Sequence, residues 1–120
     1  MKLLIAVALM LAIPQQDRAQ TPATRQPTFM VIFSLGPNWD SAKPADQQTG
    51  FREHSANLQR LRAAKSILLG GRYSDKGMVI VEAQNEGAAR AMFESDPMVR
   101  ERVFNMELQP FAPFYPGCVP

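Results

Sequence analysis

The chain of 120 residues is poor in the residues that build disulfides and metal centres. It has one cysteine, Cys118, and one histidine, His54. A single cysteine cannot form an internal disulfide, and no cysteine and histidine residues have the spacing of metal ligands. A phosphate-binding loop is also missing, because Gly70 and Gly71 fall in a predicted strand without the helix and lysine that such a loop needs. We therefore expect no metal and no cofactor.

Clusters of one charge are missing as well. Lysine and arginine number 13 against 11 aspartate and glutamate residues, a net charge of +2, and the two signs are scattered along the chain. This pattern predicts no nucleic-acid partner and no basic patch for a membrane surface. With 46% hydrophobic residues, a chain of this length folds around one core.

The longest apolar run stands at the N-terminus. Lys2 precedes an unbroken apolar segment, residues 3–13, that is too short to span a bilayer and has the length of a secretory signal. We predict a signal peptide over residues 1–19, although Asp17 fits the small-residue rule poorly and leaves the cleavage site open. Residues 20–27 form a linker, and residues 28–120 form the mature domain with a proline-rich, aromatic tail. The mature protein is then periplasmic or secreted, without a membrane contact.

Four segments have the composition of β-strands: residues 28–34, 66–73, 78–82 and 103–108. The first and third are apolar on both faces, which is typical of a central position in a sheet with both sides covered, whereas the fourth alternates like an edge strand. Residues 74–77 predict a hairpin turn with Gly77 at a positive φ. Gly70 and Gly71 indicate a bulge or the close approach of another backbone or of a ligand.

Two helical patterns separate these strands. The first covers residues 50–64, and the second covers residues 86–95 with Asn85 as its cap. Asp96 and Pro97 then start a further helical turn, as N-cap and first residue. Residues 35–49 form a long loop around Trp39, which is either a lid over a binding site or a surface loop pinned by that residue.

The first helical pattern carries the histidine on its apolar side. His54 falls in the stripe of Phe51, Leu58 and Leu61, so its ring points inward. A hydrogen-bonded core histidine is one interpretation. The other is a general acid or base that faces a buried cavity, because imidazole titrates near neutral pH.

The element order is β-α-β-β-α-β, an α+β chain of ferredoxin-like topology with both helices on one face of an antiparallel sheet. The second face would stay bare although the first and third strands are apolar there. We therefore expect a homodimer in which two sheets pack face to face as a dimeric α/β barrel.

Several weak motifs together resemble the YciI-like (YCII-related) family over residues 29–114. They are Arg52-x-His54 followed by Leu58 and Leu61, the strand Leu69-Gly70-Gly71, the segment Ser95-Asp96-Pro97, and Pro110-Phe111. Ser55 departs from the aliphatic residue that often follows the histidine in that family. The resemblance implies a dimeric α/β barrel, similar to muconolactone isomerases, with His54 and Asp96 as the catalytic pair.

Such a pair suits acid/base chemistry, because a carboxylate orients the imidazole and stabilises the imidazolium. Asp96 also has a simpler interpretation as a helix cap, and the two roles are compatible. Serine nucleophiles are not indicated, since Ser34 and Ser55 lack a nucleophile elbow. We predict a lyase, isomerase or hydrolase for a small organic acid or lactone, or else a non-catalytic protein that binds a small molecule or a partner. The candidate substrate-binding residues are Arg52, Ser34, Trp39 and Gly71.

Overall fold

The computed structural model describes residues 25–115 and 117. The predicted signal peptide, most of the linker and Cys118 lie outside these residues. None of the helices in the described ranges is long and apolar enough to cross a membrane. In chain order the elements are β1 (Thr28–Leu35), the 3₁₀ helix η1 (Ala45–Gln47), α1 (Phe51–Ala63), β2 (Ile67–Tyr73), β3 (Lys76–Glu82), α2 (Glu86–Ala91), α3 (Pro97–Arg100) and β4 (Phe104–Pro110).

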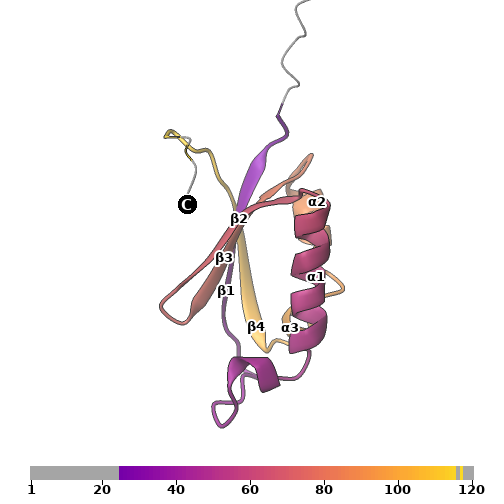
Figure 1. The fold of residues 1–120 in the computed structure, drawn as a ribbon, viewed down its shortest axis with the longest axis vertical. Helices are drawn as coiled ribbons and strands as arrows, with labels where there is room; N and C mark the ends of the chain where they lie inside the picture. The colour runs from indigo at the N-terminus through magenta and orange to yellow at the C-terminus, as the bar shows by residue number, and fades with distance from the viewer. Residues whose placement is uncertain (1–24, 116, 118–120) are drawn as a thin grey trace, which may run out of the picture.

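The four strands form one antiparallel sheet in the order β2-β3-β1-β4. Figure 1 shows α1 and α2 on the same side of this sheet, with α3 near the start of β4. The chain is therefore α+β, and its topology is compatible with a ferredoxin-like fold. The central place of β1 and the edge place of β4 were both predicted from their hydrophobic patterns.

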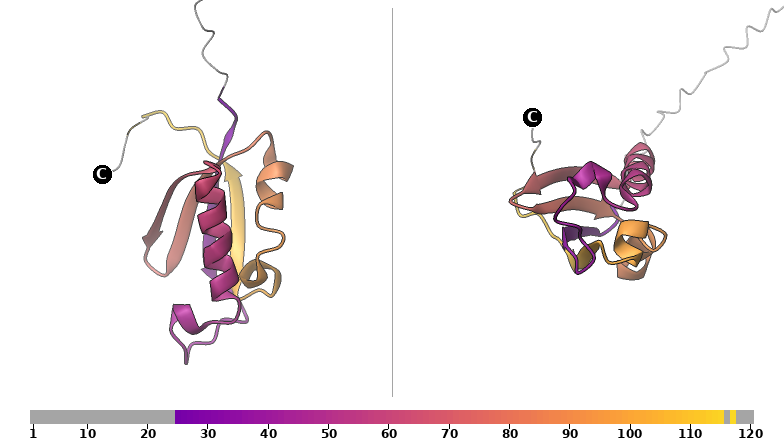
Figure 2. Two further views of the ribbon diagram at one scale, coloured as in Figure 1. Left: turned by 45° about the vertical axis from the view of Figure 1, so that its right-hand side comes forward. Right: turned by 90° about the horizontal axis from the view of Figure 1, so that it is seen from below.

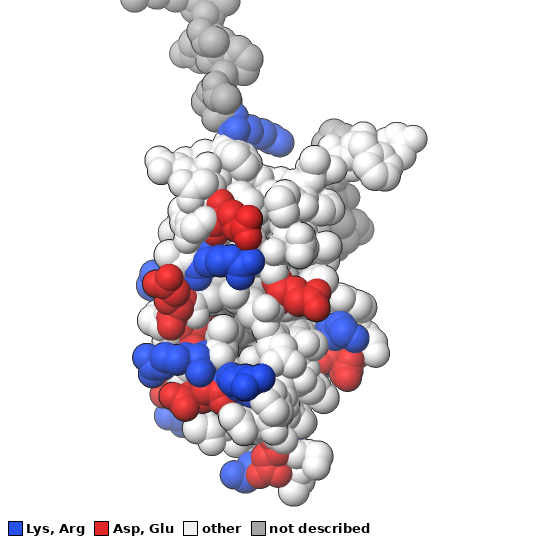
Figure 3. Space-filling model, turned by 180° about the vertical axis from the view of Figure 1, so that it is seen from behind, with Lys and Arg blue, Asp and Glu red and all other residues white. Residues whose placement is uncertain are grey.

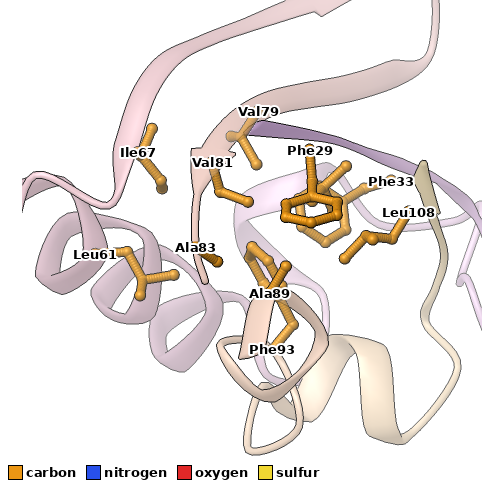
Figure 4. Packing of buried hydrophobic residues seen from close by; sticks show 11 residues of the cluster. Phe29, Phe33, Leu61, Ile67, Val79, Val81, Ala83, Ala89, Phe93 and Leu108 are labelled. Carbon is orange, nitrogen blue, oxygen red and sulfur yellow. The ribbon is translucent and has the colours of Figure 1, made fainter. Parts of the chain in front are cut away.

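The core lies between the sheet and the helices. In β1 the side chains of Phe29, Val31 and Phe33 are buried, while Met30 and Ile32 point to the other face and are only partly covered. Burying a large apolar side chain stabilises the fold by roughly 1.5–3 kcal/mol, so this alternating strand is a major source of stability. Figure 4 shows the cluster, whose buried members are Phe29, Val31, Phe33, Leu61, Ile67, Val79, Val81, Ala83, Ala89, Phe93 and Leu108.

A glycine brings the start of α1 against α3. Gly50, the N-cap of α1, has a φ of 82°, in the left-handed region that favours glycine. A Cβ atom there would stand 3.1 Å from Cγ of Pro97. The first turn of α1, which carries His54, is thus held beside Asp96 and Pro97.

The second helix is shorter than predicted. Asn85 caps α2 as expected, its Oδ1 accepting from the backbone N–H of Ala88 at 2.8 Å. However, α2 ends at Ala91 instead of continuing to residue 95. The Met92 carbonyl accepts a hydrogen bond from Nδ2 of Asn57 on α1 at 3.0 Å, and the chain turns there. This contact between distant segments is not visible in a local helical pattern.

The hairpin between β2 and β3 also differs from the expectation. Tyr73 pairs with Lys76, so the turn consists of Ser74 and Asp75, and Ser74 takes the positive φ of 52°. Gly77 is not in the turn but in β3, opposite Arg72. The irregularity in β2 falls between Ile67 and Leu69 rather than at the paired glycines. Figure 2 shows this hairpin projecting beside α1 and the η1 loop.

The face of the sheet away from the helices is largely apolar over β1, β2 and β3. Pairing and strand alternation place six hydrophobic side chains on it: Met30, Ile32, Leu69, Tyr73, Met78 and Ile80. Leu69 and Tyr73 keep 40% and 46% of their surface exposed. Elsewhere, on the side of the molecule in Figure 3, acidic and basic side chains are interspersed and form no patch of one sign.

Candidate active site

His54 and Asp96 form a hydrogen-bonded pair between α1 and the start of α3. Nδ1 of His54 lies 2.5 Å from Oδ2 of Asp96. Both side chains are almost completely covered, with 8% and 0% of their surface exposed. An ionised carboxylate can only accept hydrogen bonds, so Nδ1 is the donor, and in the neutral ring Nε2 then keeps its lone pair.

Asp96 holds this position because it also caps α3. Its Oδ1 accepts from the backbone N–H of Met98 at 3.0 Å, and Pro97 occupies the first helical position. One carboxylate oxygen therefore serves the helix and the other serves the imidazole. The capping role and the pairing role, which the sequence indicated to be compatible, occur together.

Aromatic rings fix the plane of the imidazole. The His54 ring meets two phenylalanine rings edge-to-face. Its centroid lies 5.1 Å from that of Phe33, with an angle of 88° between the planes, and 5.3 Å from that of Phe104, with an angle of 68°. Trp39 stacks on Phe104, with the ring centroids 5.7 Å apart and the planes at 18°. Such arrangements are favourable for aromatic pairs and restrict rotation of the ring about its bond to the helix.

Nε2 of His54 faces a cavity. Every buried side-chain nitrogen and oxygen among the described residues has a hydrogen-bond partner, and Nε2 has no protein partner, so Nε2 keeps access to open space. His54 lines a cavity of about 540 Å³, a size suited to a small organic molecule. Its wall consists of Phe33, Leu35, Trp39, Ala45, Phe51, His54, Ser55, Leu58, Gly70, Gly71, Arg72, Ser74, Asp75, Lys76, Gly77, Met78, Val79 and Phe104.

The cavity exists because the sheet has glycines on its helix-facing side. Gly77 pairs with Phe33 on one side and Arg72 on the other, and Gly70 pairs with Val79. A Cβ atom at Gly77 would meet only Cδ2 of Phe33, at 3.9 Å, so the space above this glycine is open. Side chains at these positions would fill the floor of the cavity. Gly77 was missed as a site residue because it was assigned to the turn, although a two-residue hairpin loop is the commoner form.

Hydrogen bonds of Gln48 hold the loop that carries Trp39. The buried side chain of Gln48 donates to the carbonyls of Asp40 and Lys43, at 2.7 and 2.9 Å, and accepts from the N–H of Asp40 at 3.0 Å. Trp39 N–H also donates to the carbonyl of Gly36 at 3.1 Å. The loop is thus a fixed wall of the cavity. No local sequence signal marks Gln48, whose partners are several residues away.

Two of the four predicted substrate-binding residues line the cavity, namely Trp39 and Gly71. Arg52 is exposed and lies outside the cavity wall, because two residues on a helix are about 200° apart and His54 points inward. Ser34 is half-buried and follows Phe33 in β1, so it points to the opposite face of the sheet. The structure does not bring Arg52 and Ser34 together with His54.

Four ionisable residues line the cavity: His54, Arg72, Asp75 and Lys76. Asp75 and Lys76 form an exposed ion pair at 3.6 Å. Within residues 25–115, no group of three or more histidine, cysteine, aspartate or glutamate side chains is placed to hold a metal ion. The polar chemistry of the site is therefore carried by the His54–Asp96 pair and by side chains at the hairpin end of the cavity.

The chain was also compared with known proteins. A scan against models of protein families and a search of curated proteins found no match.

Proposed function

We propose that the chain is a small exported protein of the YciI-like type, a cofactor-independent enzyme that uses His54 and Asp96 for acid/base chemistry on a small organic acid or lactone. The observation that carries the proposal is the 2.5 Å contact between Nδ1 and Oδ2, with Nε2 turned to the cavity. A histidine that served packing alone would not need an open second nitrogen.

In this mechanism Nε2 accepts a proton from the substrate, or from a water molecule that attacks it. The ring becomes imidazolium, and Asp96 stabilises that charge through the Nδ1–H bond. In an isomerase, imidazolium returns the proton to another atom of the same molecule. In a lyase the electron pair of the broken C–H bond forms the new double bond, while the leaving group departs with the electron pair of its own bond to carbon. In a hydrolase the activated water adds to the carbonyl, and the imidazolium gives its proton to the departing alkoxide oxygen.

The proposal includes a homodimer that joins the two bare sheet faces as a barrel. Support comes from Met30 and Ile32 of β1 and from Met78 and Ile80 of β3, which share that face. The YciI-like resemblance leads to the same dimer. Export rests on the apolar segment at residues 3–13, and N-terminal sequencing of protein from the native host would test it.

The alternative is a protein that binds a small molecule in the cavity without converting it. Binding needs only the apolar wall, whereas catalysis needs the open Nε2 and its carboxylate partner. The geometry of the pair favours the enzyme over the binding protein.

Proton exchange is a direct test that does not require the natural substrate. A panel of unsaturated lactones and small carboxylic acids is incubated with the protein in D₂O, and NMR follows deuterium entry at the carbon next to the carbonyl. We expect exchange with at least one compound, lost in His54→Ala and strongly reduced in Asp96→Asn, but kept in Asn85→Ala, which removes only the exposed cap of α2. Binding with neither exchange nor hydrolysis of any compound, or exchange that survives His54→Ala, would contradict the enzyme.

A further inference from the structure

Arg72 is the charged side chain of the cavity that has no ionic partner among the described residues. Of the other charged groups there, Asp75 and Lys76 pair with each other at 3.6 Å. Lys76 also lies over the ring of Tyr73, 6.0 Å from its centroid, on the face of the sheet away from the helices. Arg72 pairs with Gly77 and alternates with Tyr73, so its side chain leaves the sheet on the helix-facing side, toward the cavity.

Arg72 of β2 and His54 of α1 line the same cavity. Three residues pair across neighbouring strands in one row: Arg72 of β2, Gly77 of β3 and Phe33 of β1. The ring of Phe33 contacts that of His54. Neighbouring strands lie about 4.8 Å apart, so the backbones of Arg72 and Phe33 are separated by roughly 10 Å. Gly77 between them has no side chain. The backbone of Arg72 therefore lies two strands away from the aromatic ring that contacts His54.

Four aromatic rings line this cavity, those of Phe33, Trp39, Phe51 and Phe104. Phe33 and Phe104 flank the imidazole, Trp39 stacks on Phe104, and Phe51 and Leu58 of α1 also line the cavity. Aromatic side chains accommodate a planar ring by stacking or by edge-to-face contact. A guanidinium offers a planar pair of N–H donors that matches a carboxylate.

We propose that Arg72 binds the carboxylate of a small aromatic or unsaturated-ring acid, which directs the ring along the aromatic wall toward Nε2 of His54. The inference deepens the proposed function and rests on it for the fate of the ligand, because a bound acid is converted only if the pair is catalytic. It replaces Arg52 by Arg72 as the arginine that recognises the substrate.

The test is equilibrium binding, read from the fluorescence of Trp39, the only tryptophan in the chain. Benzoate is the probe, benzamide is its neutral counterpart of the same shape, and acetate is a carboxylate without a ring. We expect benzoate to bind more tightly than both. Arg72→Gln should weaken benzoate at least ten-fold and leave benzamide unchanged, while Arg72→Lys should recover part of the affinity.

Arg90→Gln is the matched control, because it removes an exposed arginine of α2 whose partner is Glu86. It should bind benzoate like the unmodified protein. The proposal is overturned if benzoate does not bind, if benzamide binds equally well, or if Arg52→Gln rather than Arg72→Gln weakens benzoate. Binding does not require turnover, so His54→Ala should keep most of the benzoate affinity even though it abolishes proton exchange. A failure of this inference is thereby separated from a failure of the enzyme proposal.

Discussion

Replacing Asp96 by alanine should destabilise the protein more than any ordinary cap deletion. The substitution removes the bond that Oδ1 accepts from Met98 N–H, which is the cap of α3, and the bond from Oδ2 to Nδ1 of His54. Losing a cap costs about 1 kcal/mol, and an unpaired buried donor costs about 1–3 kcal/mol more. Because both side chains are nearly inaccessible to water, water molecules cannot replace the lost hydrogen bonds. The expected total is about 2–4 kcal/mol of unfolding free energy.

Urea unfolding at one fixed protein concentration measures the effect, since the stability of the proposed dimer would depend on concentration. Asn85→Ala is the matched control, because Asn85 caps α2 with a comparable bond of 2.8 Å and is exposed. This control substitution should lower the unfolding free energy by about 1 kcal/mol. A cycle of Asp96→Ala, His54→Ala and the double variant isolates the coupling between the two side chains. The reasoning is refuted if Asp96→Ala costs no more than Asn85→Ala, or if the cycle shows no coupling.

Three further substitutions test other parts of the site and the assembly. Gly77→Leu should fill the floor of the cavity and abolish ligand binding in the Trp39 fluorescence assay. The protein should stay folded, because a Cβ atom there would meet only Phe33, at 3.9 Å. Unchanged binding would contradict the position of the cavity. Gln48→Ala removes three hydrogen bonds from the Trp39 loop. This substitution should lower the unfolding free energy by about 1–3 kcal/mol and speed hydrogen exchange at the Asp40 amide. An exchange rate like that of the unmodified protein would show that other contacts hold the loop. Ile32→Asp places a charge on the bare sheet face and should dissociate the proposed homodimer, as measured by light scattering; a stable monomer in the unmodified protein would exclude that dimer.

The features that could be predicted from the sequence are those with a local signal. Two-sided apolar character placed β1 in the centre of the sheet, and alternation placed β4 at its edge. The caps at Asn85 and Asp96 follow from residue types at helix starts, and both form the predicted bonds. The inward aim of His54 follows from helical periodicity. These features together were enough to place His54 and Asp96 on the same side of the sheet.

What could not be predicted depends on contacts between distant residues. The early end of α2 involves a side chain of α1, since Asn57 binds the Met92 carbonyl. Gly77 becomes part of the cavity floor only once the register of the hairpin is known. The same register turns Arg72 toward the cavity, whereas the motif around His54 had pointed to Arg52. Ser34 is a different case, because alternation within the predicted strand, a local signal, already sends it to the opposite face from Phe33.

The central claim is that Asp96 keeps a hydrogen on Nδ1 of His54 and leaves Nε2 open to the cavity. Asp96→Asn makes a distinctive change in this arrangement. The Met98 N–H needs an acceptor, so the amide oxygen of the new asparagine takes the capping place of Oδ1 and its NH₂ group faces the imidazole. That NH₂ group donates to Nδ1, and a neutral ring must then carry its hydrogen on Nε2.

Long-range ¹H–¹⁵N NMR of the single histidine distinguishes the two tautomers of the neutral ring directly. The account predicts the Nδ1–H tautomer in the unmodified protein and the Nε2–H tautomer in Asp96→Asn, with no other imidazole to confuse the spectrum. An Nε2–H tautomer in the unmodified protein, or the same tautomer mixture in both proteins, would contradict the pair.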